Sequence, residues 1–235
     1  MNHERDQADD RVDVLAADIR TNLRHIRARL AASTDRTGVE VVAVTKGHGP
    51  DAVVACLKNG LTMFGENYAD ELVAKANDPR LFGAGWTFQG RLQTNKINRL
   101  RPFVGLWQTV DSEERAAALS KRVPTGHVLV QLNLTGAVGR GGIEPDRAAG
   151  LIERARALGL RVEGVMGLGP DPDELGWAKQ RSLDAFRIAV SIADVHDLAI
   201  RSLGMSGDFE LAAEAGATMV RIGTMLLGPR RAPFG

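Results

Sequence analysis

Residues 39–50 read VEVVAVTKGHGP, an apolar, β-branched run that ends at a lysine and is followed at once by two glycines and a proline. Such a run predicts one buried strand of a parallel sheet, and the glycines and proline predict a loop directly after it. The strand therefore ends on Lys46. A lysine in this place either extends its stem to solvent, which is the more common case, or lies desolvated in a cleft, where its amine becomes a nucleophile toward aldehydes.

The same strand-and-loop pattern recurs through the rest of the chain. Apolar runs alternate with helical segments, so eight β/α units predict an α/β fold, a single (β/α)8 TIM barrel. An open doubly wound sheet is the alternative, since it shares the alternation but usually has fewer strands. The expected strands lie near 39–45, 61–64, 85–88, 106–110, 127–134, 162–166, 199–203 and 218–222, and the expected helices near 51–59, 67–77, 94–101, 112–121, 145–158, 174–190 and 207–215.

An extra helix is expected before the first strand, because apolar residues recur there at spacings of one, three and four. It ends before a loop at 33–38. We expect residues 1–10 to form a flexible N-terminus, residues 11–230 a single barrel domain, and residues 231–235 a C-terminal tail. The apolar stripe of the expected helix consists of Val14, Leu15, Ile19, Leu23, Ile26 and Leu30.

Composition indicates an ordinary globular protein. The chain has 235 residues, 44% hydrophobic and 25% charged, with a net charge of +1, so nothing favours nucleic acid or an acidic membrane surface as a partner. The polar start is unlike a signal peptide, and no apolar stretch approaches the roughly 18 residues that span a bilayer, so we expect a cytoplasmic protein. One cysteine, Cys56, excludes an intrachain disulfide, and the five histidines lack zinc-site spacing, so no metal is expected.

Barrels of this class carry functional groups where strands end, and the last two strands end in anion-binding residue types. The seventh leads into LGMSGDFE (203–210), where Ser206 and Gly207 precede a helix; an ordinary helix N-cap is the simpler interpretation of that corner alone. The eighth gives Arg221, Gly223 and Thr224. In a closed barrel these corners flank Lys46, and a lysine beside a phosphate cup is the minimum equipment for pyridoxal 5′-phosphate.

Other polar residues near strand ends are weaker candidates. They line a cleft in one interpretation, and cap helices or face solvent in the other. They are Glu66 and Asn67 in FGENY (64–68), Gln89, Arg91 and Asn95 in WTFQGRLQTNK (86–96), and Arg140 in the glycine-rich loop 136–142.

The chain resembles the pyridoxal-phosphate homeostasis proteins, whose barrel is shared with the N-terminal domain of alanine racemase. The match runs in order from about residue 10 to 230. The resemblance implies that Lys46 holds the cofactor as an aldimine and that Arg221 faces its pyridine nitrogen. It implies further that Asn67 and Met205 lie beside the cofactor, and that Ser206, Gly207, Gly223 and Thr224 bind its phosphate. The segments that carry the match are VVAVTK (41–46), FGENY (64–68), the 86–96 segment, VDS (110–112), GVMGLGP (164–170) and LGMSGDFELAAEAGATMVRIGT (203–224).

The sequence departs from the usual pattern of these proteins at several positions, which leaves the roles of some residues open. The departures are Thr45, Thr87, Gln89, Arg91, Arg140 and Gly207. None of them removes the lysine or the phosphate cup.

The resemblance implies a protein that buffers pyridoxal phosphate and delivers it to apo-enzymes, with no strong turnover of its own. The alternative is a fold-type III enzyme such as an amino-acid racemase, and a third interpretation is a barrel that has lost the cofactor. Racemisation needs a second acid or base, which racemases of this type take from a C-terminal β domain. We expect that domain to be absent and the protein to be a monomer; the one tyrosine is Tyr68.

Overall fold

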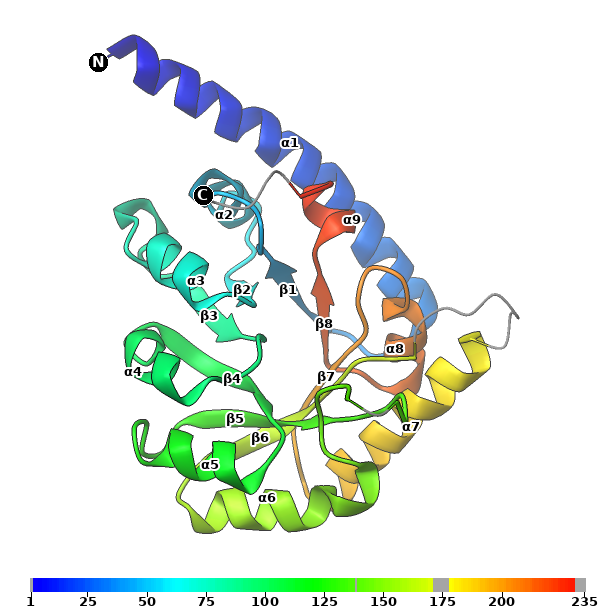
Figure 1. The fold of residues 1–235 in the computed structure, drawn as a ribbon. Helices are drawn as coiled ribbons and strands as arrows, with labels where there is room; N and C mark the ends of the chain where they lie inside the picture. The colour runs from blue at the N-terminus through cyan, green and yellow to red at the C-terminus, as the bar shows by residue number, and fades with distance from the viewer. Residues whose placement is uncertain (1, 138, 171–177, 231–235) are drawn as a thin grey trace.

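The computed structural model describes residues 2–137, 139–170 and 178–230, and its strands form a closed parallel barrel (Figure 1). β1 pairs with β2 on one side and with β8 on the other, so the predicted (β/α)8 barrel is confirmed and the open sheet is excluded. The strands are β1 (Glu40–Val44), β2 (Met63–Glu66), β3 (Gly85–Phe88), β4 (Val104–Val110), β5 (His127–Leu132), β6 (Arg161–Gly167), β7 (Ile200–Leu203) and β8 (Met219–Ile222).

Helices follow the strands and cover the outside of the barrel (Figure 1). They are α1 (Asn2–Ser33), α2 (Pro50–Leu57), α3 (Ala69–Ala76), α4 (Ile97–Leu100), α5 (Glu113–Ser120), α6 (Ala148–Ala157), α7 (Ala178–Val195), α8 (Phe209–Ala215) and α9 (Thr224–Leu227), with 3₁₀ turns η1 (Pro79–Leu81), η2 (Thr94–Lys96) and η3 (Pro145–Arg147).

Two short helical pieces are additional to the expectation, and two expected helices are split. The sequence pattern does not predict η1 or α9, because three or four residues are too few to show a helical period. The helix expected at 94–101 is split into η2 and α4, and the helix expected at 145–158 is split into η3 and α6. The start of the helix expected at 174–190, at 174–177, and the tail expected at 231–235 lie outside the described residues.

α1 lies against α2, α8 and α9 (Figure 1). It begins at Asn2, so residues 2–10 are helical where the sequence predicts a flexible segment. The predicted stripe is wrong at Val14, which is 65% exposed, and Leu15 is only partly buried. Val14 is two residues from each neighbour of the true stripe, which turns it to the opposite side of the helix. The buried stripe, at alternating spacings of four and three, is Val12, Ala16, Ile19, Leu23, Ile26 and Leu30.

Truncating this stripe is expected to weaken the fold. Ile26→Ala removes a fully buried side chain, so we expect it to lower the free energy of unfolding by about 2–5 kcal/mol. Val14→Ala is the matched control, for which we expect a change within about 0.5 kcal/mol. Urea unfolding followed by circular dichroism measures both. Equal effects of the two substitutions would contradict the packing of α1 described here.

The inside of the barrel changes from apolar to polar along its strands. Residues two apart on a strand share a face, and on four strands an apolar inward residue is followed two positions later by a polar one. The polar end is therefore the end at which the strands run into their following loops, where this fold places its functional groups. The pairs are Leu106 and Gln108 on β4, Leu129 and Gln131 on β5, Ile200 and Ser202 on β7, and Met219 and Arg221 on β8.

Candidate functional site

Lys46 lies just beyond β1, at the polar end of the barrel, and is half-buried. Burial lowers the pKa of its amine, and the nearby guanidinium of Arg230 lowers it further, while the carboxylate of Glu66 acts in the opposite direction. An amine with a lowered pKa loses its proton at a lower pH than an ordinary lysine. Lys46 is therefore better suited than an ordinary lysine to attack an aldehyde.

Arg230 lies directly over the loop that follows Lys46. A Cβ atom added at Gly47 would stand 3.4 Å from Cδ of Arg230, and Gly47 has a φ of +73°, a conformation that favours glycine. The sequence pattern did not single out Arg230, because it follows α9 in a stretch that reads as a chain end. No local signal shows that this stretch returns to the end of β1.

The loops after β7 and β8 meet beside β1, as the sequence predicts. The hydroxyl oxygen of Ser206 accepts a hydrogen bond from the backbone N–H of Met225 at 3.4 Å, which joins the two corners. A Cβ atom added at Gly223 would lie 3.4 Å from the carbonyl oxygen of Val44, the last residue of β1. Ser206 is half-buried and Thr224 is exposed.

Two residues of the β7 corner, Gly207 and Met205, are exposed, whereas Asp208 is partly buried. Gly207 is exposed, and a Cβ atom added to it would meet nothing within 4 Å. Met205 is 42% exposed. Asp208 precedes α8 but does not cap it with its side chain; its carboxylate accepts a hydrogen bond from the N–H of Met205 at 2.6 Å. Burial raises the pKa of this carboxyl group, and Arg221 acts against that rise.

Arg221 is buried inside the barrel and held by its neighbours. Its guanidinium donates to the carbonyl and hydroxyl oxygens of Ser202, at 2.5 and 2.9 Å, and to the carbonyl of Gly167 at 2.8 Å. Burial lowers its pKa to about 10, so it stays charged at neutral pH. The chain of bonds continues across the barrel: Ser202 donates to Gln108 at 2.8 Å, and Gln108 donates to Thr87 at 2.7 Å. Thr87 thus belongs to the barrel interior.

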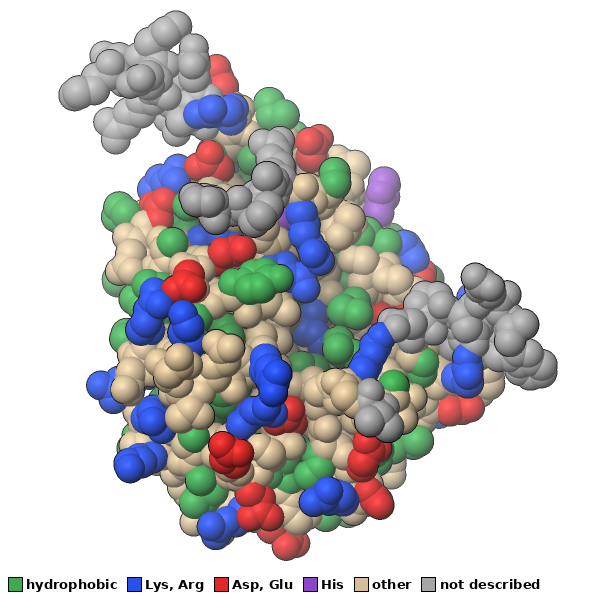
Figure 2. Space-filling view, viewed as in Figure 1, with side chains coloured by type: hydrophobic (Ala, Val, Ile, Leu, Met, Phe, Trp, Pro, Cys, Tyr) green, Lys and Arg blue, Asp and Glu red, His purple; other side chains and the backbone are tan. Residues whose placement is uncertain are grey.

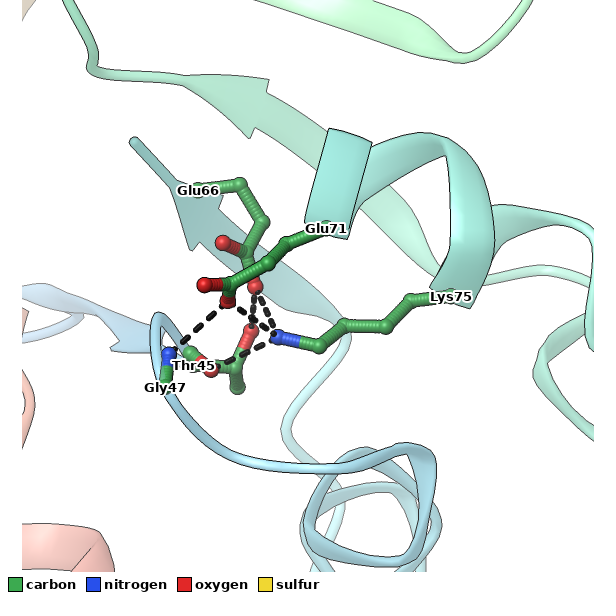
Figure 3. Close-up of polar contacts among 5 residues, drawn as sticks. All are labelled: Thr45, Gly47, Glu66, Glu71 and Lys75. Atoms are coloured by element: carbon green, nitrogen blue, oxygen red, sulfur yellow. Dashed lines mark hydrogen bonds and ion pairs between the residues drawn. The ribbon is translucent and has the colours of Figure 1, made fainter. Parts of the chain in front are cut away.

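A buried charged network binds Thr45 and Gly47, the residues on either side of Lys46 in the chain (Figure 3). The ammonium of Lys75 is bound to Glu66 Oε1 at 2.5 Å, to the carbonyl of Thr45 at 2.7 Å and to Glu71 Oε2 at 3.3 Å. Glu71 also accepts a bond from the N–H of Gly47 at 2.8 Å. Burial raises the pKa of Glu66, and Lys75 acts against that rise.

Sequence reasoning missed Glu71 and Lys75 because charged residues on a helix usually face solvent. One signal was present. Lys75 is spaced by three residues from Leu72 and by six from Ala69, the two buried apolar residues of α3, so it falls on the buried face.

Three buried polar atoms at the ends of β2 and β3 have no hydrogen-bond partner among the described residues: Glu66 Oε2, Asn67 Oδ1 and Gln89 Nε2. Buried polar atoms are normally partnered, so atoms of this kind suit the polar groups of a ligand. The three belong to residues that the sequence had marked as weaker candidates.

Two cavities adjoin these strand ends. Asn67 and Arg91 line one of about 390 Å³, and Gln89, Arg91 and Arg140 line another of about 370 Å³. Asn95 is exposed on η2 and lines neither cavity. Figure 2 shows Lys and Arg side chains gathered across the middle of this face, which favours anionic ligands.

Two other classes of feature are absent from the part of the chain that the structure describes. No helix there is long and apolar enough to cross a membrane. No group of three or more His, Cys, Asp or Glu side chains there could hold a metal ion. Cys56 is buried, which raises its pKa to about 12.

Comparisons with known proteins agree over most of the chain. The profile of the alanine racemase N-terminal domain matches residues 14–231. A "Pyridoxal phosphate homeostasis protein" of Vibrio cholerae is 33% identical over 231 residues, covering 90% of this chain and 96% of that protein. The mouse protein of the same name is 32% identical over 213 residues, covering 81% and 76%.

Solved structures share the fold. PipY of Synechococcus elongatus, solved with pyridoxal phosphate bound, has a TM-score of 0.75 and 26% identity, covering 89% of this chain and all of that one. A protein of Bifidobacterium adolescentis has a TM-score of 0.82 and 26% identity, covering 91% and 96%. Alanine racemase of Clostridium difficile, at 17% identity and a TM-score of 0.72, covers 89% of this chain and 56% of that one and shows the fold alone. The chain belongs to the alanine racemase N-terminal domain family, together with the pyridoxal phosphate homeostasis proteins.

Proposed function

We propose that this protein binds pyridoxal 5′-phosphate on Lys46 and serves pyridoxal phosphate homeostasis, taking up the cofactor and passing it on without strong turnover of its own. One observation carries the proposal. Lys46 is half-buried with a lowered pKa, and it lies beside the loops after β7 and β8, which are hydrogen-bonded to each other. The names of its relatives and the cofactor bound to PipY support the same function.

The residues present fit this cofactor. We assign the phosphate to the Ser206 and Thr224 hydroxyls and to the backbone at Gly207 and Gly223, where the absence of side chains lets an anion approach. When bound, the cofactor supplies an aldehyde that reacts reversibly with amines. The amine of Lys46 provides the covalent hold.

Three further residues are assigned to the ring. Arg221 faces the pyridine nitrogen; because a guanidinium does not give up its proton at neutral pH, the nitrogen stays unprotonated. Asn67 and Met205 lie beside the ring. The Asn67 Oδ1 atom, buried without a partner among the described residues, suits a polar substituent of the cofactor.

Absorption spectroscopy tests the proposal. Added pyridoxal phosphate is expected to give an imine band that borohydride fixes, and peptide mass spectrometry is expected to find the reduced adduct on Lys46. Because burial and Arg230 lower the Lys46 pKa, the band is expected to form at a lower pH than with free Nα-acetyl-lysine, and to grow as pH rises through that pKa. The absence of a band, or an adduct on another lysine, refutes the assignment.

A transfer assay tests the carrier role. The loaded protein, freed of unbound cofactor, is expected to restore activity to an apo-aminotransferase, and racemisation of L-alanine by the same preparation is expected to stay at background. Rapid racemisation would favour the enzyme alternative. We further propose that the protein is a cytoplasmic monomer whose partners are apo-enzymes of this kind; light scattering on a gel-filtration column measures its mass.

A further inference from the structure

The two peptide groups on either side of Lys46 are both bound by one helix, α3 (Figure 3). The carbonyl of Thr45 belongs to the peptide before Lys46, and Lys75 donates to it at 2.7 Å. The N–H of Gly47 belongs to the peptide after Lys46, and Glu71 accepts from it at 2.8 Å. Glu71 and Lys75 are four residues apart, so they lie on one side of α3 and reach the same loop.

These contacts are buried and closely connected. Lys75 is 1% exposed and Glu66 is fully buried. Their ion pair at 2.5 Å is joined by the hydroxyl of Thr45, which donates to the same carboxylate oxygen at 2.6 Å. The network therefore binds the end of β1 through a side chain as well as through the backbone.

Stability alone does not account for a lysine at this place. Lys75 lies on the same buried face of α3 as Leu72. Replacing a buried ion pair with well-packed apolar residues often leaves the free energy of unfolding unchanged or raises it. What an apolar residue cannot do is bind the carbonyl of Thr45 and a carboxylate together. The distinctive contribution of Lys75 is thus its hold on the backbone next to Lys46.

We propose that Lys75 and Glu71 are positioning residues for Lys46. By holding the peptide groups before and after it, they fix the direction in which its side chain leaves β1. The amine stands at the end of a four-carbon stem, so a small rotation of the backbone moves it by an ångström or more. This inference rests on the proposed function of Lys46, because the group being positioned is the cofactor-binding amine.

Variants of Glu71 on α3 test the hydrogen bond to the N–H of Gly47. Glu71→Ala removes the acceptor, and we expect the dissociation constant for pyridoxal phosphate, from absorption titration, to rise about tenfold or more. Glu71→Gln keeps an acceptor and is expected to stay within about threefold of wild type. Asp51→Ala is the control: it removes a carboxylate on α2 that pairs with Arg80 at the surface and lines neither cavity. The affinity of this variant is expected to be unchanged. A Gln variant as weak as Ala overturns the role of this hydrogen bond.

Lys75→Met tests the hold on Thr45 with a side chain of similar length. We expect imine formation, followed by stopped-flow absorption, to slow by about 10- to 100-fold in protein that circular dichroism shows to be folded. If Lys75→Met does not fold, Glu71→Ala decides. Folded Lys75→Met and Glu71→Ala variants with wild-type rate and affinity overturn the inference, whereas a wild-type protein without a band overturns the proposed function instead.

Discussion

Lys46→Ala is expected to abolish the imine band completely and to weaken pyridoxal phosphate binding on the order of a hundredfold or more, because the covalent hold is lost and only the phosphate and ring contacts remain. The fold should be retained, since the side chain is only half-buried and lies beyond the last residue of β1. Absorption spectra with and without borohydride, together with equilibrium dialysis, measure both effects.

Lys58→Ala is the control for this experiment. Lys58 is exposed after α2, where it pairs with Asp13, so its removal should leave the band and the affinity unchanged. Residual binding to Lys46→Ala should be displaced by inorganic phosphate, because the corners after β7 and β8 are intact. A Lys46→Ala protein with a full, borohydride-sensitive band would place the imine on another lysine.

Gly164→Ala is expected to prevent folding or to lower the free energy of unfolding by more than about 4 kcal/mol. A Cβ atom at this position would lie 1.9 Å from the carbonyl oxygen of Ile200, its partner on β7. The atom in the way is backbone, so no side-chain rotation relieves the clash. The strands would have to separate, and in a closed barrel that disturbs pairing all the way round.

Gly150→Ala provides the matched control. Gly150 is exposed in the first turn of α6, with nothing within 4 Å of an added Cβ atom, so alanine is expected to stabilise the protein by up to about 1 kcal/mol. Soluble yield and urea unfolding report both variants. A Gly164→Ala protein as stable as wild type would show that β6 and β7 do not approach as closely as described.

The barrel and the residues at the ends of its strands could be predicted because their signals are local. Lys46 ends an apolar run, and glycines follow the seventh and eighth strands, so each marks the end of its strand without reference to the rest of the chain. The helical spacing of apolar residues also located α1, although it wrongly assigned Val14 to the buried stripe. An error of that kind is expected where apolar residues crowd one end of a helix.

The missed residues depend on contacts between distant parts of the chain or on the burial of charge. Arg230 reaches Gly47 only because the barrel closes, and nothing within its own segment indicates this. Lys75 and Glu71 look like an ordinary surface pair four residues apart until the helix is seen to turn them toward Thr45 and Gly47. The roles assigned to Asn67, Met205 and the phosphate corners stay predictions until a ligand is bound.

The pairing of β1 with β8 closes the barrel between its first and last strands, where Glu40 stands opposite Met219. Lys46 follows β1 directly, so it lies where these two strands meet. α1 packs against α2, α8 and α9, so it covers the outside of the barrel where β1 and β8 pair. A nascent chain therefore carries Lys46 long before it has the loops after β7 and β8 that lie beside it. On the assignment proposed above, capture of the cofactor waits for these last two strands, so a chain truncated before β7 is expected not to bind it.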